Sequence, residues 1–165
     1  MPLFIPLGWI DTWALACAIR RQQKDLAGEG VRMLDVLTAD KARWQPALNV
    51  VSRVRRRLRE VQKIMPALNA YEIAVAEIEQ LDGHKQIGWD TWDKGEPEIT
   101  LHVGIVTNPF SRLYCGTEVW SVGVGDVVAI DAAPAVLRSA VNHGDTARIH
   151  LILRLRQRAT EEDEQ

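Results

Sequence analysis

The second half of the chain is a series of short segments in which apolar and polar residues alternate, and this feature limits the fold more than any other. Seven such segments follow one another from residue 71 onward, separated by turns such as "TNP", "GVGD" and "NHGD". Alternation with a period of two is typical of β-strands, and many short strands at close spacing predict a sandwich or a small barrel. The segments are "YEIAVAEIEQL", "EITLHVGIV", "RLYCG", "EVWSV", "DVVAID", "VLRSAVN" and "ARIHLILRL".

The first 70 residues show helical periodicity instead. Asp11 is placed to cap a helix that extends to about residue 26, where "AGEG" ends it. A second helix is predicted from about 47 to 64, because apolar residues recur there at spacings of three and four until a Met-Pro pair. These helices would cover one side of the strands, so we expect an α+β protein that is mainly β.

The length of 165 residues suits one domain with a single core. We divide the chain into a helical part over 1–70, a β core over 71–156 and an acidic tail over 157–165. The net charge of −2 gives no overall field that would attract nucleic acid or a membrane. Two distant cysteines give no disulfide framework, and the apolar N-terminus lacks a basic leading segment, so we expect a cytoplasmic protein without a signal peptide or membrane span.

The predicted second helix carries five arginines opposite its apolar stripe, in the segment "RVRRRLR". Such a run can contact nucleic acid or an acidic partner, but it is more often a solvated face, and no basic groove studded with aromatic residues accompanies it. The acidic segment "EEDEQ" is able to offset its charge within or between molecules. We therefore expect no nucleic acid, and we expect a protein partner or a homo-oligomer that uses Phe4, Trp9 and Trp13.

The period of two also sorts the strand residues onto faces. Three strands each have one face of small and polar residues, which carry His102, Arg138 and Arg148. If these faces meet, they line a cavity; if they face water, there is no site, and the period alone does not decide. Trp89 and Trp92, in "GWDTWDKG", either pack at the rim of the core or line a pocket or interface.

Three pieces of the chain, "LHVGIVTNPFSRLYCGTE", "VGDVVAID" and "SAVNHGDTARIHLIL", carry a resemblance to a known family. From about residue 72 to 155 the sequence resembles the aspartyl/asparaginyl (prolyl) β-hydroxylase-like family of Fe(II)/2-oxoglutarate oxygenases. The resemblance implies a double-stranded β-helix, also called a jelly-roll or cupin-like fold, preceded by the two helices. It also implies that Arg148 binds the far carboxylate of 2-oxoglutarate, a task that suits a planar bidentate donor, and that His102 lies on the cosubstrate side.

The iron ligands of that family are missing. Its second iron-binding His lies ten residues before the Arg, where this chain has Arg138. Its first iron ligand belongs to a His-x-Asp or His-x-Gly element. Alignment on the aromatic-acid repeat places Gly88 at the His and Asp90 at the acid, and a count without gaps places Asp90 and Trp92 there instead. Arginine has no lone pair to donate to a metal. We therefore expect no metal, no catalytic residue and no cofactor, with Arg148 and His102 as anion-binding residues and Gly88, Asp90 and Arg138 as degenerate metal positions.

Three functions remain open on this basis. The first is a catalytically degenerate, metal-free module for binding or structure, in an oligomer or a larger assembly such as a virus particle. The second is an active hydroxylase that uses Fe(II) and 2-oxoglutarate, and the third is a cupin-like protein that binds a small anion such as a carboxylate. Without a metal, we expect Arg138 to point inward and pair with Asp90 in its place; the alternative is that Arg138 turns outward into solvent and apolar side chains close the pocket. Arg148 then needs its own acceptor, which is a bound anion, a backbone carbonyl, or a carboxylate such as Asp131 or Glu118.

Overall fold

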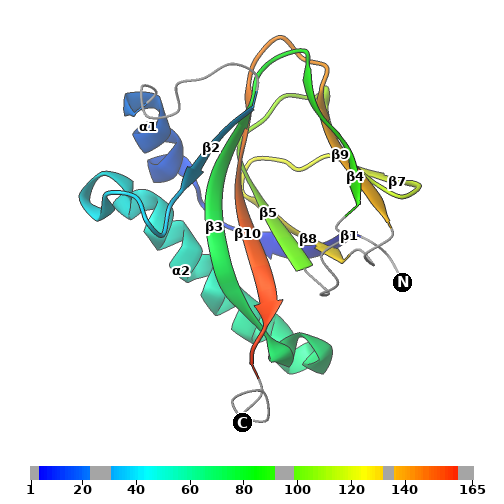
Figure 1. The fold of residues 1–165 in the computed structure, drawn as a ribbon. Coiled ribbons are helices and arrows are strands. Elements are labelled where there is room, and N and C mark those ends of the chain that lie inside the picture. Colours follow the sequence, from blue (N-terminus) through cyan, green and yellow to red (C-terminus); the bar gives the residue numbers. More distant parts are fainter. Residues whose placement is uncertain (1–3, 23–30, 92–98, 132–135, 160–165) are drawn as a thin grey trace.

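The computed structural model describes residues 4–22, 31–91, 99–131 and 136–159, which form two helices, a 3₁₀ turn and two antiparallel sheets (Figure 1). The helical elements are α1 Trp13–Arg21, α2 Lys41–Ile64 and the 3₁₀ turn η2 Pro66–Ala70. The strands are β1 Phe4–Trp9, β2 Val31–Asp35, β3 Tyr71–Leu81, β4 Lys85–Thr91, β5 Ile99–Val106, β6 Ser111–Cys115, β7 Glu118–Trp120, β8 Asp126–Asp131, β9 Leu137–Asn142 and β10 Arg148–Gln157.

The two sheets face one another as a jelly-roll. The six-stranded sheet has the order β1-β8-β5-β10-β3-β2, and the four-stranded sheet has the order β4-β9-β6-β7. Both helices lie on the outer side of the six-stranded sheet, and the smaller sheet lies on its other side (Figure 1). The predicted fold class, α+β and mainly β with a double-stranded β-helix after the first helices, is confirmed.

The interpretation of residues 1–70 as helical was incomplete. β1 pairs with β8 and β2 pairs with β3, so the first 70 residues supply both outermost strands of the large sheet. β1 was not predicted because Pro6 and Gly8 interrupt the alternation of apolar and polar residues there. The β1–β8 pairing shifts register between these two residues. The prediction that Phe4 is a surface contact residue was wrong, since Phe4 is buried between the sheets, whereas Trp9 and Trp13 are exposed.

The second helix begins earlier than predicted. Asp40 caps α2 by accepting a hydrogen bond from the amide of Ala42 at 2.9 Å. The backbone departs from helical geometry at Trp44, two residues before Pro46, so the helix is kinked there. The sequence pattern had instead predicted that the helix begins after this point, at about residue 47. The part of the first predicted helix beyond residue 22 lies outside the described residues.

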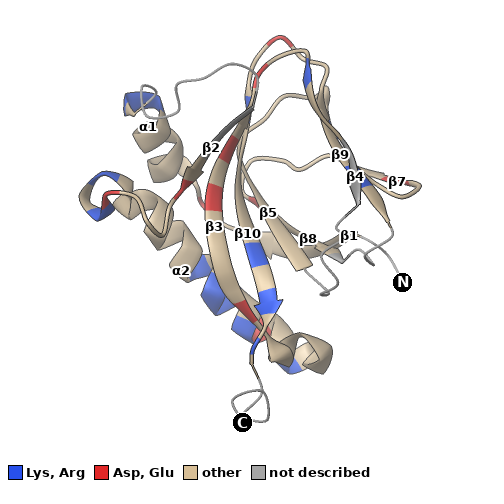
Figure 2. Ribbon diagram, in the orientation of Figure 1, with Lys and Arg blue, Asp and Glu red and all other residues tan. Residues whose placement is uncertain are grey.

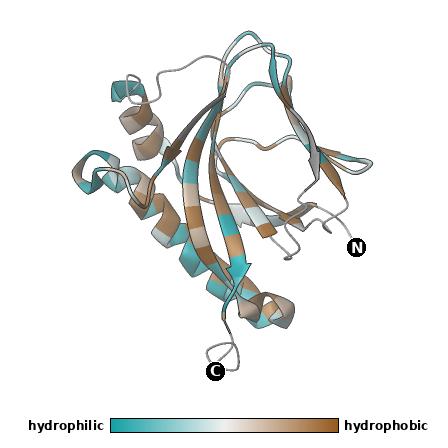
Figure 3. Cartoon of the chain, viewed as in Figure 1, coloured by the Kyte–Doolittle hydropathy of each residue, from teal (hydrophilic) through white to brown (hydrophobic). Residues whose placement is uncertain are grey.

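The main core lies between α2 and the large sheet. The apolar stripe of α2 is buried against the helix-facing side of the strands. Its hydrophobic residues are among the brown bands on α2 in Figure 3. This stripe comprises Val50, Val51, Val54 and Leu58. The arginines of "RVRRRLR" lie on the exposed side of α2, as the blue bands of Figure 2 show, so this run is a solvated face. Within the described residues, no helix has the length and apolar character that crossing a membrane requires.

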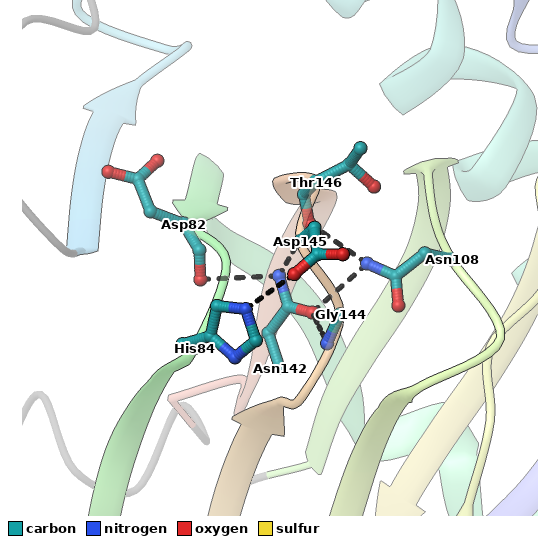
Figure 4. A network of polar contacts seen from close by, with 7 residues as sticks. All are labelled: Asp82, His84, Asn108, Asn142, Gly144, Asp145 and Thr146. Carbon is teal, nitrogen blue, oxygen red and sulfur yellow. Dashed lines mark hydrogen bonds and ion pairs between the residues drawn. The ribbon is translucent and has the colours of Figure 1, made fainter.

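The "NHGD" turn is connected by hydrogen bonds to neighbouring loops at one end of the jelly-roll (Figure 4). Asn142 is fully buried, and its amide group makes five hydrogen bonds. Its Nδ2 donates to the carbonyls of Leu81, Asp82 and Thr146, and its Oδ1 accepts from Asn108 Nδ2 and Gly144 N. A side chain at residue 144 would clash with Asn108, so the turn requires glycine there. This network fixes the start of β10, and with it the position of Arg148.

Candidate functional site

A pocket of about 320 Å³ lies between the two sheets. The small sheet contributes Gly88 and Arg138, and the large sheet contributes Thr100, His102 and Arg154. The polar faces of the strands therefore meet, which is the first of the two arrangements that the alternation left open. The opposite faces of β5 and β10, with Leu101 and Leu151 among their residues, pack toward the helices, as the period of two predicts.

Arg138 points into this pocket. Its side chain is half-buried, and its Nη1 donates a weak hydrogen bond of 3.5 Å to Thr100 Oγ1 across the cavity. In the β4–β9 ladder, Asp90 lies directly opposite Arg138. The side chain of Asp90 is outside the described residues, as are those of Trp89 and Trp92, so the Arg138–Asp90 ion pair stays a prediction.

Gly88 lines the same pocket from β4. A Cβ atom added to Gly88 would meet no other atom within 4 Å, so the backbone there borders open space. The two residues that the resemblance places at the iron-binding histidines, Gly88 and Arg138, thus come from neighbouring strands and border one cavity.

Arg148 lies beside the pocket but does not line it. Its side chain is fully buried, and its Nη2 donates to Glu79 Oε1 of β3 at 2.5 Å. Burial lowers the pKa of Arg148 below its usual value, and the charge of Glu79 opposes this shift. Nε and Nη1 have no hydrogen-bond partner among the described residues. Glu79 is therefore the acceptor for Arg148, and the sequence analysis did not propose it. The two residues are 69 positions apart in the sequence, and the pairing of β3 with β10 brings them together.

Two buried histidines contact one another at the pocket, and one of them, His102, lines it. His102 Nδ1 and His150 Nδ1 lie 3.2 Å apart, with the rings edge to face. Burial, followed by the charges of Arg148, Arg138 and Arg154, lowers the pKa of His102 to about 3. Burial, Arg148 and His102 lower the pKa of His150 in the same direction. Both rings are therefore neutral near pH 7, one donating the shared hydrogen bond and the other accepting it.

Arg154 completes the cationic lining. The sequence analysis gave Arg154 no role, yet it lines the pocket from β10. Its Nη2 lies 3.6 Å from Glu77 Oε2. The signal that could have found it is its place two residues beyond Ile152 on the inward face of the strand.

Comparison of the sequence with known protein families and with curated proteins finds no match. Solved structures do match over nearly the whole chain. An oxidoreductase of the 2OG-Fe(II) oxygenase family from Burkholderia pseudomallei is 12% identical, with a TM-score of 0.71 over 94% of this chain and 85% of that one. A prolyl-4-hydroxylase from Pseudomonas putida is 11% identical, with a TM-score of 0.69 over 95% and 94%. The viral collagen prolyl hydroxylase of Paramecium bursaria Chlorella virus-1, in complex with 2OG, is 11% identical, with a TM-score of 0.66 over 96% and 97%.

This chain has the fold of the 2OG-Fe(II) oxygenases. The residues of the oxygenase-like pocket do not fit the iron of that family, however. An iron site of this class needs two neutral imidazoles and usually a carboxylate. The positions that the resemblance aligns with the two histidines hold Arg138, a permanent cation, and Gly88, which has no side chain. Among the described residues, no cluster of three His, Cys, Asp or Glu side chains could hold a metal.

The cosubstrate does not fit in the expected way either. The resemblance gives Arg148 the far carboxylate of 2-oxoglutarate, but the carboxylate of Glu79 already occupies its Nη2. Arg148 is also sealed from the pocket, with no exposed side-chain surface. The carboxylate of Glu79 thus takes the place beside Arg148 that the resemblance assigns to the cosubstrate.

The buried histidine pair predicts a pH-dependent stability. The unfolded chain protonates His102 near pH 6.5, while the folded chain resists protonation until about pH 3. Above pH 6.5, the contribution of His102 to the free energy of unfolding should therefore be constant. Below pH 6.5, the free energy of unfolding should decrease as the pH is lowered, by at most about 1.4 kcal/mol per pH unit. Urea unfolding of H102Q from pH 7 to pH 4 should show a shallower decline than the wild type.

The exposed His143 provides the matched control for that experiment, because it contacts neither buried ring. H143Q is expected to keep the slope of the wild type. A slope in H102Q equal to that of the wild type would show that His102 titrates alike in the folded and unfolded chains.

Proposed function

We propose that this protein is a metal-free binding module built on the oxygenase fold, and that its interior pocket binds a small anion such as a carboxylate. The observation that carries the proposal is the set of three guanidinium groups whose charges act on His102, two of which line a cavity of about 320 Å³. Guanidinium groups bind carboxylates and phosphates through charge-assisted hydrogen bonds, often two at once.

The charges around the pocket support an anion over a cation. Glu79 lines the cavity, but the ion pair with Arg148 offsets its charge, and Glu77 lies beside Arg154. Arg138 and Arg154 both present guanidinium groups to the cavity, which favours an anion over a cation as its ligand. The neutral imidazole of His102 adds a hydrogen-bonding group without a charge of its own.

Calorimetric titration tests the proposal with succinate, 2-oxoglutarate and inorganic phosphate, and with succinamide as the neutral analogue. R138Q and R154Q should each weaken binding of the best anion about tenfold or more, because each loses a charge-assisted hydrogen bond. R56Q, on the exposed side of α2, should bind as the wild type does. Failure of all three anions to bind, or equal binding of succinamide, would contradict the proposal.

The alternative of an active oxygenase is tested in the same samples. The protein is incubated with Fe(II), 2-oxoglutarate and oxygen, and succinate is measured. We expect no succinate above the rate of the R138Q variant. Stoichiometric iron in the purified protein, or turnover that R138Q abolishes, would replace the binding-module proposal with that of a hydroxylase.

A further inference from the structure

A second hollow opens at the edge of the molecule, beside the outermost strand of each sheet. Among the described strands, β1 is at the edge of the six-stranded sheet and β7 at the edge of the four-stranded sheet (Figure 1). The hollow has a volume of about 330 Å³. It is lined by two aromatic side chains and a carboxylate, and its apolar lining includes a proline and a valine. These residues are Trp9, Trp120, Asp126, Pro6 and Val128. It shares no lining residue with the interior pocket.

Both tryptophan rings are held in place by contacts within the fold. Trp9 Nε1 donates a hydrogen bond of 3.0 Å to the carbonyl of Val124, and a side chain on Gly125 would clash with this ring. Trp120 stacks on Phe4, with ring centroids 5.7 Å apart and an interplanar angle of 25°. Rings that are already fixed lose little conformational entropy when a ligand binds.

Asp126 supplies a negative charge next to these rings. It lies directly opposite Trp9 in the β1–β8 ladder, where the Cβ atoms of paired residues are about 5 Å apart. Its Oδ2 accepts a hydrogen bond of 2.9 Å from the amide of Gly123, which orients the carboxylate. The guanidinium of Arg57 packs against Gly8 from α2, but it pairs with Glu60 at 2.9 Å, so its charge is balanced there.

We propose that this hollow binds a methylated ammonium group. Indole faces attract cations through the negative face of the ring, and a quaternary ammonium is the cation that gives up water most readily. The valine and proline walls accept its methyl groups, and the carboxylate of Asp126 balances its charge. An anion would be repelled by Asp126, and a neutral apolar group would cover that carboxylate without compensating it.

The first test titrates choline into the full-length protein and follows the indole N–H signals of Trp9 and Trp120 by NMR. Its neutral carbon isostere, 3,3-dimethylbutan-1-ol, should bind about tenfold more weakly or worse, because it lacks the charge. D126N keeps an acceptor for the Gly123 amide and removes the charge, so it should weaken choline binding about tenfold. W9A should have a similar effect, since Trp9 is 65% exposed and its loss leaves the core intact.

W13A is the matched control, because Trp13 is 69% exposed and lies outside the hollow. It should bind choline as the wild type does. The proposal is overturned if choline produces no saturable shift of either indole signal, if the neutral isostere binds equally well, or if W13A loses as much affinity as W9A.

A further arm identifies the source of the ammonium group. A short peptide that contains trimethyllysine is compared with choline. Tighter binding of the peptide assigns the site to a side chain of a partner protein, and tighter binding of choline assigns it to a free small molecule. Neither outcome depends on the interior pocket, so R138Q should behave as the wild type in both titrations.

Discussion

Replacement of Glu79 by alanine is expected to destabilise the protein by about 3–5 kcal/mol, because it leaves the cation of Arg148 buried without a counter-charge. Arg148 has no exposed side-chain surface, and the side chain of Glu79 is only 7% exposed. Two of the guanidinium nitrogens of Arg148 already lack a hydrogen-bond partner among the described residues, so the ion pair with Glu79 is its principal compensation. Urea unfolding at pH 7 measures the loss.

Glu72 on the same strand provides the matched control. Its side chain is 60% exposed, and its Oε2 lies 3.8 Å from Arg158 Nε in an exposed pair. E72A should therefore cost about 0–1 kcal/mol. Equal losses in E79A and E72A would show that Arg148 is compensated by something other than Glu79.

Two further measurements distinguish two causes of the stability loss in E79A: the unpaired charge of Arg148 and the packing of the Glu79 side chain. The double variant E79L/R148M replaces the pair with apolar side chains and should recover most of the stability that E79A loses. Acetate or formate should partly restore the stability of E79A and leave E72A unchanged, because a small carboxylate can take the vacated place beside Arg148. If carboxylate has no effect on E79A, then that place is closed to external anions.

The double variant G88H/R138H is expected to bind one equivalent of a divalent transition metal, such as Co(II) or Ni(II), where the wild type binds none. Gly88 and Arg138 border the same cavity, and no atom lies within 4 Å of a Cβ added at Gly88. The two substitutions supply two imidazoles, remove the cation, and place a histidine two residues before Asp90. Two histidines and a carboxylate are the donor set that open iron sites use.

The single variants are the controls for this gain of binding. G88H keeps the cation of Arg138 in the pocket, and R138H supplies only one new imidazole, so each should bind metal far more weakly than the double variant. G88H/D90N/R138H should lose affinity if Asp90 is the third ligand. Absence of metal from the double variant would show that these positions do not converge, and the assignment of the degenerate metal positions would then be wrong.

Much of the interior could be predicted from local periodicity. The alternation in β5 and β10 decides which residues share a face, and the structure confirms that His102 and Ile152 face the smaller sheet while Leu101 and Leu151 face the helices. The "NHGD" segment was predicted to be a turn between strands, and its tight geometry explains why it must contain a glycine. These features follow from bonds and sterics within a few residues of one another.

The partners of those residues could not be predicted in this way. β1 was missed because its pattern is broken by Pro6 and Gly8, and only its pairing with β8, more than a hundred residues away, makes it a strand. Edge strands of this kind are stabilised by their neighbours and not by their own propensity.

The sequence by itself determined the jelly-roll class, the assignment of Arg138 and His102 to the polar faces of their strands, and the absence of histidine from the positions that resemble iron ligands. Only the tertiary structure decided that the polar faces meet, that Glu79 pairs with Arg148, and that Arg154 lines the pocket. It also decided that Trp9, Trp120 and Asp126 line one hollow. The physical reason is the range of the interactions. A side chain's face is set by the backbone geometry of its own strand, whereas its partner depends on which distant strands pair and in which register.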